Sequence, residues 1–99
     1  MCGATAGGPS LQGVDLAEEA VVQGIVLRDG QPVGGAYVRL LDGGGEFTAE
    51  VPTSATGQFR FFAAAGTWTL RTLAPRSAPV DHTVVAELGE IADVEVLIA

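Results

Sequence analysis

The sequence contains no lysine and only five arginines, against twelve aspartates and glutamates, so the formal net charge at pH 7 is −7. Proteins that bind nucleic acids or anionic membrane surfaces need a basic patch, which releases counterions or meets lipid headgroups. Five arginines scattered among carboxylates do not form such a patch in the sequence. We therefore expect neither nucleic acid nor membrane among the partners of this chain.

Cysteine is also scarce, because Cys2 is the single one. One thiol cannot form an intramolecular disulfide, which excludes a disulfide-held secreted scaffold and favours a reducing, cytoplasmic compartment. The first twenty residues lack the basic and apolar regions of a signal peptide, and no apolar run approaches the roughly 20 residues of a membrane span. A start of Met-Cys followed by Gly, Ser and Pro also fits a lipoprotein trimmed of its signal, and that alternative stays open.

Length and composition predict one domain. A chain of 99 residues that is 47% hydrophobic and 17% charged has room and apolar area for a single core. Residues 1–13 are rich in glycine and contain, after the initial Met, one sizeable apolar side chain, Leu11, and the following VDLAEEA is too short for a stable helix. We expect a flexible N-terminal tail and lead-in over residues 1–19 and a folded domain over residues 20–99.

From Ala20 onward, short runs rich in Val, Ile, Phe and Thr are separated by Gly, Pro and Asp at spacings of about 8 to 12 residues, which is typical of an all-β domain. Asp29-Gly30 allows the positive φ angles of a tight turn, and Pro32 presets the next bend. The run of three glycines from Gly43 is interpreted as a hairpin loop, because a phosphate-binding loop needs a following helix. The sequence predicts a seven-stranded antiparallel Greek-key β-sandwich, with strands at 20–28, 36–42, 46–52, 57–63, 67–73, 80–86 and 91–98.

Alternation along these strands predicts which side chains are buried, because successive side chains point to opposite faces. The predicted core comprises Ala36, Val38, Leu40, Phe47, Ala49, Val51, Phe59, Phe61, Trp68, Leu70, Val94, Val96 and Ile98. The opposite faces carry a mixed polar surface of Arg39, Glu46, Thr48, Glu50, Arg60, Thr69 and Arg71.

Residues suited to catalysis or metal binding are few. A transition-metal site needs three or four converging ligands, and the chain has one His and one Cys. His82 is the single candidate base for a nucleophilic triad. The serines lie in tail or turn segments rather than at a nucleophile elbow: Ser10, Ser54 and Ser77. We therefore expect no metal, no cofactor and no catalytic residues, and predict that the protein is not an enzyme.

Three arginines on the predicted outer faces, Arg39, Arg60 and Arg71, would form an anion-binding site if their strands are neighbours. Glu46 and Glu50 share their parity, so a cross-strand salt-bridge network is the favoured alternative.

Two aromatic residues with polar groups are candidates for ligand stacking. Trp68 falls on the inward side of its strand, which favours packing between the sheets over stacking on a ligand. Tyr37 falls on the outward side, where it covers the sheet.

The stretch VVQGIVLRDGQPVGGAYVRLLD, followed by TSATGQFRFFAAAGTWTLRT, resembles the carboxypeptidase regulatory-like, or transthyretin-like, β-sandwich domain. The resemblance covers Val21 to Thr72, just over half of the chain. Hydroxyisourate hydrolases of the transthyretin-like group use more than one His and end in Tyr-Arg-Gly-Ser, whereas this chain has His82 alone and ends in Val-Leu-Ile-Ala. The resemblance therefore implies the fold without that activity.

The N-terminal MCG, the block LLDGGGEFTAEVPTSATGQFRFFAAAGTWTLR and the length resemble a small actinobacterial family often described as SseC-like sulfur-metabolism proteins, which are encoded beside a thiosulfate sulfurtransferase. This resemblance implies a cytosolic, non-catalytic accessory role in sulfur metabolism, with a sulfurtransferase or another protein as partner. The alternative function is a generic small-ligand or carbohydrate-binding module. Cys2 is the candidate reactive thiol, either as a persulfide acceptor or, in the favoured interpretation, as an inert tail residue.

The edge strands of an open sandwich need protection from pairing with other chains. The C-terminal VEVLIA has neither Lys nor Pro to blunt it, and the mean hydropathy of the chain is +0.36. The sequence therefore predicts a homo-oligomer formed through edge strands, with this segment as the favoured edge.

Overall fold

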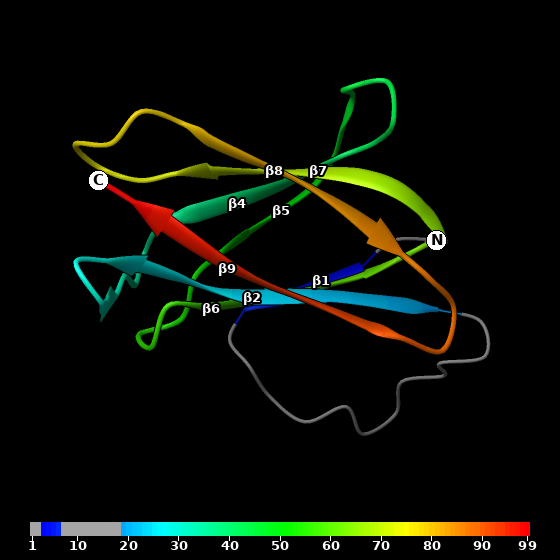
Figure 1. Cartoon of the computed structure of the whole chain (residues 1–99), viewed down its shortest axis with the longest axis horizontal. Helices are drawn as coiled ribbons and strands as arrows, with labels where there is room; N and C mark the ends of the chain where they lie inside the picture. Colours follow the sequence, from blue (N-terminus) through cyan, green and yellow to red (C-terminus); the bar gives the residue numbers. More distant parts are fainter. Residues whose placement is uncertain (1–2, 7–18) are drawn as a thin grey trace.

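The computed structural model describes residues 3–6 and 19–99, and the regular structure in these residues consists of β-strands (Figure 1). None of the described residues belongs to a helix long and apolar enough to cross a membrane. The all-β class is confirmed. The strands are β1 (Gly3–Ala6), β2 (Ala20–Arg28), β3 (Gln31–Pro32), β4 (Tyr37–Leu41), β5 (Phe47–Pro52), β6 (Gln58–Ala63), β7 (Gly66–Leu73), β8 (Val80–Ala86) and β9 (Ile91–Ile98).

The strands form two sheets that pack face to face as a sandwich. Sheet A has the order β1, β6, β2, β3, with β9 paired to β2, and sheet B has the order β5, β4, β7, β8. Each of the seven predicted strands is present with bounds within one residue of the prediction. In Figure 1, β8 and β9 cross the same side of the molecule, one from each sheet.

Strand β1 was not predicted, because it lies in the segment that the sequence assigns to a flexible tail. It pairs antiparallel with β6, so that Gly3 lies opposite Phe62 and Ala6 lies opposite Phe59. The sequence GATA has no large apolar side chain to indicate a strand, and its pairing is a tertiary contact. The predicted tail therefore contributes a strand to sheet A, while residues 1–2 and 7–18 lie outside the described residues.

Strand β9 runs parallel to β2, which corrects the prediction of a purely antiparallel sandwich. Residues 87–90 carry the chain from β8 in sheet B to β9 in sheet A, so the two strands do not form a hairpin. The hydrophobic pattern sets which face of a strand is buried but not the direction of its neighbour. Close approach of β9 depends on Gly24, because a Cβ atom there would collide with the Val94 carbonyl oxygen.

Two predicted turns have the expected chemistry. Asp29 and Gly30 both adopt positive φ angles, 52° and 77°, which join β2 to β3. In the loop between β4 and β5, the Asp42 carboxylate accepts hydrogen bonds from the backbone N–H groups of Gly44 and Glu46, both at 2.9 Å. The glycine run is therefore a hairpin loop, as predicted.

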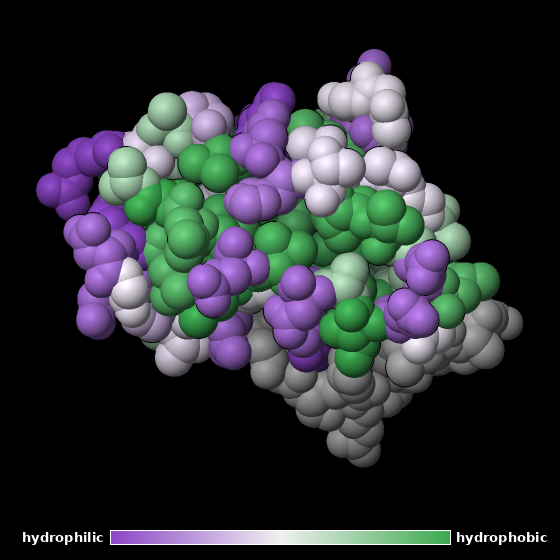
Figure 2. Space-filling view, viewed as in Figure 1, coloured by the Kyte–Doolittle hydropathy of each residue, from purple (hydrophilic) through white to green (hydrophobic). Residues whose placement is uncertain are grey.

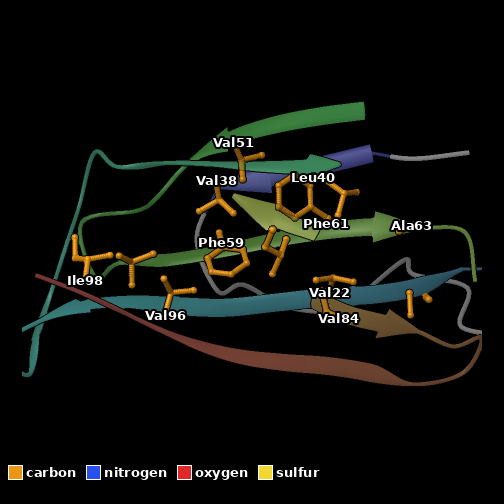
Figure 3. Close-up of a cluster of buried hydrophobic side chains, with 14 residues drawn as sticks. Val22, Val38, Leu40, Val51, Phe59, Phe61, Ala63, Val84, Val96 and Ile98 are labelled. Atoms are coloured by element: carbon orange, nitrogen blue, oxygen red, sulfur yellow. The ribbon is translucent and has the colours of Figure 1, made fainter. Parts of the chain in front are cut away.

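The core lies between the sheets, and Figure 3 shows its side chains pointing from both sheets into one cluster. The rings of Phe59 and Phe61 are both fully buried and lie 6.2 Å apart at an angle of 58°. The face assignment is confirmed for these buried residues: Ala36, Val38, Leu40, Val51, Phe59, Phe61, Leu70, Val96 and Ile98. Ala49, Trp68 and Val94 are partly buried against the same cluster.

Phe47 is the exception, since 60% of its surface is exposed. The register between β4 and β5 shifts at Leu40 and Leu41, so that Leu40 pairs with Ala49 but Leu41 pairs with Phe47. A one-residue bulge sends the side chains beyond it to the opposite face of the strand. Phe47 therefore lies on the outer face, where the Arg39 guanidinium is 6.0 Å from its ring centre.

Two buried threonines differ in their hydrogen bonding. The Thr53 hydroxyl accepts a bond from the Ala36 N–H at 3.0 Å and donates one to the Val33 carbonyl at 2.7 Å. The Thr72 hydroxyl has no hydrogen-bond partner within the described residues. Thr53 therefore links the loop before β4 to the end of β5, whereas the Thr72 hydroxyl forms no such link within the described residues.

Candidate functional site

The outer face of sheet B places two predicted anion-site residues side by side, because Arg39 and Arg71 occupy paired positions on β4 and β7. Each one forms an ion pair instead. The Arg39 Nε lies 2.6 Å from Glu50 Oε2, and the Arg71 guanidinium donates to both carboxylate oxygens of Asp81, at 2.9 and 3.0 Å. The salt-bridge alternative therefore describes these two arginines.

The pairing changes the acidity of its members. The hydrogen bond from Arg71 is the largest influence on the Asp81 carboxyl and holds its pKa below the ordinary value of 3.8. Slight burial opposes that shift, while the charges of Arg71 and His82 reinforce it. The same hydrogen bond raises the pKa of Arg71. Both groups are therefore charged at neutral pH.

Arg60 does not join the other two arginines, because it lies on β6 in sheet A. This corrects the expected convergence, since alternation along a strand cannot tell which of two sheets the strand enters. Arg60 is 4% exposed, and its Nε donates to Gln23 Oε1 on the neighbouring strand at 2.9 Å. The prediction that Arg60 lies on an open polar surface is also wrong.

A pocket of about 260 Å³ lies beside Arg60 in sheet A. Its polar lining comes from three adjacent strands: Gln23 on β2, Gln58 and Arg60 on β6, and Asp93 on β9, with Ile25 as an apolar wall. Amides both donate and accept hydrogen bonds, so this set suits a small polar ligand. Sequence reasoning missed the pocket because these strands become neighbours only in the folded sheet.

The remaining candidates for chemistry are dispersed. His82 is half-buried on β8, and no cluster of three or more potential metal ligands occurs among residues 3–6 and 19–99. The Ser54 hydroxyl accepts hydrogen bonds from nearby backbone N–H groups, and the Ser77 hydroxyl donates to the Ala78 carbonyl. Both serines therefore stabilise local turns, and Ser10 lies outside the described residues.

The two polar aromatics lie as predicted. The Trp68 indole N–H donates to the Ala64 carbonyl at 3.0 Å while the ring packs against the core. Tyr37 is 50% exposed on sheet B. The candidate thiol, Cys2, lies outside the described residues.

The side of the sandwich formed by β8, β9 and the loop of residues 87–90 carries exposed apolar side chains. We call it the β8–β9 surface. Of the six large hydrophobic residues that are exposed in the described part of the chain, four belong to these segments: Val85 on the outer face of sheet B, Leu88 in the loop, and Ile91 and Leu97 on the outer face of sheet A. Figure 2 shows hydrophobic side chains across the middle of this side, with hydrophilic ones among and around them. An apolar area rimmed by polar groups is typical of an interaction surface.

Comparison with known proteins identifies relatives of this chain. The family described as "Protein of unknown function (DUF1416)" matches residues 2–98. A Mycolicibacterium smegmatis protein, described as uncharacterized, is 57% identical over 89 residues, which cover 88% of this chain and 97% of that protein.

Solved structures with similar folds share little sequence with the chain. The major pilin subunit BcpA of Bacillus cereus has a TM-score of 0.69 at 14% identity, over 82% of this chain and 29% of the pilin chain. A DUF3823 family protein from Parabacteroides merdae has a TM-score of 0.64 at 19% identity, over 84% of this chain and 47% of its own. The chain thus spans less than half of either protein, and these likenesses concern the β-sandwich fold alone.

Proposed function

We propose that this chain, which belongs to the DUF1416 family of actinobacterial β-sandwich proteins, is a non-catalytic accessory protein that binds a protein partner in sulfur metabolism. The observation that carries the partner-binding role is the β8–β9 surface, where Ile91 and Leu97 are 41% and 63% exposed. These two side chains share the outer face of sheet A, and exposed apolar side chains favour association with another protein.

The sulfur-metabolism part of the proposal is supported by the sequence resemblance to SseC-like proteins. It designates a cytoplasmic thiosulfate sulfurtransferase from the same organism as the first partner to test. The ion pairs Arg39–Glu50 and Arg71–Asp81 support a non-catalytic role, because they engage four charged groups that share the outer face of sheet B.

Binding of the purified sulfurtransferase to the immobilised full chain tests this proposal. We expect saturable binding that Leu97→Asp weakens at least tenfold, because a charge would be placed in the apolar contact. Phe47→Asp is the matched control, since Phe47 is exposed to a similar degree but lies on β5 of sheet B. Absence of binding by the wild-type chain, or equal loss in both variants, would overturn the proposed role.

A small-ligand-binding module is the second candidate, and the pocket beside Arg60 is the observation that favours it. A sugar or similar polar ligand would contact the side-chain amides of Gln23 and Gln58. Nuclear magnetic resonance can follow these amide signals during titration with a panel of monosaccharides and disaccharides. Selective shifts of both signals would support this function, whereas a panel without any shift would exclude it for carbohydrates.

A further inference from the structure

The backbone of β9 has one open edge. The Val21 N–H on β2 donates to the Glu90 carbonyl just before β9. Backbone groups alternate in direction along a strand, so the even-numbered residues of β9 point to β2 and the odd-numbered ones point away from it. The N–H and C=O groups of Ile91, Asp93, Glu95 and Leu97 therefore face the open edge, where no described strand pairs with them.

The side chains of the same four residues are exposed on the outer face of sheet A. Within residues 19–99, neither Asp93 nor Glu95 forms an ion pair or a hydrogen bond with another side chain. Two acids on the edge strands of sheet B differ from those of β9 because each forms an ion pair: Glu50 on β5 with Arg39, and Asp81 on β8 with Arg71. Strand β9 thus combines unpaired backbone groups with two exposed carboxylates, of which Asp93 also lines the pocket beside Arg60.

This charge pattern disfavours a second copy of the chain as the occupant of the edge. In the antiparallel register that places Ile91 of one copy opposite Leu97 of the other, which keeps the outer faces together, Asp93 of each copy lies opposite Glu95 of the other. A parallel register aligns each acid with its own counterpart. Like charges directly opposite destabilise strand pairing, and charged residues on an edge are a known protection against self-association.

We infer that the open edge of β9 accepts an extended, basic segment of the partner protein as an additional strand of sheet A. Basic side chains on the outer face of the added strand would lie opposite Asp93 and Glu95. Apolar side chains on its inner face would extend the apolar layer that includes Val94, which is partly buried against the core. Backbone hydrogen bonds supply affinity in such strand addition, and alternate side chains supply specificity. This inference rests on the proposed partner-binding function and names the chemistry of the partner.

Eight-residue peptides of alternating Lys and Val, or alternating Glu and Val, are the probes. Fluorescence anisotropy with the full-length chain should detect binding of the Lys-Val peptide and not of the Glu-Val peptide. Hydrogen exchange should slow at the amides of Ile91, Asp93, Glu95 and Leu97 when the Lys-Val peptide binds. Equal binding of both peptides, or protection confined to other strands, would overturn the inference.

Charge reversal gives the matched test. Glu95→Lys should weaken binding of the Lys-Val peptide at least about threefold, because an attractive cross-strand pair becomes repulsive. Glu46→Lys changes the net charge equally on the loop between β4 and β5, and it should leave binding unchanged. Equal effects of both variants would show general charge attraction and refute strand addition at β9.

Two further results separate this inference from the proposed function. Sulfurtransferase binding that survives Glu95→Lys and leaves the β9 amides unprotected would overturn strand addition while the partner-binding role stands. Peptide binding at β9 without sulfurtransferase binding would do the reverse. A dimer in sedimentation experiments, with the β9 amides protected in the absence of peptide, would identify a second copy as the occupant and overturn the inference.

Discussion

Replacing Phe61 and Phe47 by Ala, one at a time, tests whether alternation along a strand or the register between paired strands decides which of the two rings is buried. Parity alone assigns both rings to the core, whereas Phe61 is 0% exposed and Phe47 is 60% exposed. Loss of a buried Phe side chain removes its transfer free energy and leaves a cavity, which together destabilise a protein by about 3 to 5 kcal/mol. Phe47→Ala should change the free energy of unfolding by no more than about 1 kcal/mol, most of it from the contact with Arg39.

Urea unfolding followed by the fluorescence of Trp68, the single tryptophan, provides the assay. A domain of this size has a total stability of about 5 to 15 kcal/mol, so Phe61→Ala removes a large part of it. At about 4 to 8 °C per kcal/mol, the melting temperature should fall by about 12 to 40 °C. Equal destabilisation by the two substitutions would refute the bulge between β4 and β5, and an unchanged melting temperature in Phe61→Ala would refute the core itself.

Two further predictions follow from hydrogen bonds. Thr53→Val should lower the free energy of unfolding by about 1 to 3 kcal/mol, because it leaves a buried backbone N–H without its acceptor. Thr72→Val should be neutral or stabilising, because the hydroxyl that it removes has no partner among the described residues. Chemical denaturation compares the two variants, and the opposite order of stability would contradict the hydrogen-bond assignment. The depressed pKa of Asp81 predicts that its pairing with Arg71 stabilises the protein at pH values above the unfolded pKa and that this contribution is lost as the pH falls through the lower folded pKa. Carboxyl titration by nuclear magnetic resonance should therefore show the pKa of Asp81 rising toward 3.8 in Arg71→Gln, and an unchanged value would show that another group causes the depression.

Local patterns predicted much of this protein. Runs of β-branched and aromatic residues between Gly, Pro and Asp predicted seven strands within one residue of their bounds, because these residues suit a pleated, half-buried backbone. Period-two alternation predicted the buried side of Phe59, Phe61 and Leu70. The positive φ angles at Asp29 and Gly30 were also predictable, since a tight turn between strands needs residues that tolerate them.

Alternation did not predict Phe47, because a single inserted residue reverses the faces beyond it without a change in composition. It also did not predict that Arg60 leaves the other two arginines, because strands of either sheet have the same pattern. The ion pairs of Arg39 and Arg71 were one of two alternatives in the sequence, and the register of β4 with its neighbours decides between them.

For the open edge of β9, too, the sequence predicted some features and the folded structure decided others. The sequence by itself determined that residues 91–98 form a strand without Lys or Pro, in which Asp93 and Glu95 alternate with apolar residues. Only the tertiary structure decided that β9 crosses to sheet A, runs parallel to β2 past Gly24, and presents Asp93 and Glu95 on an open edge. The physical reason is range: propensity and alternation act between residues adjacent in sequence, whereas strand order, direction and register depend on contacts between segments about 70 residues apart, such as Val21 and Ile91.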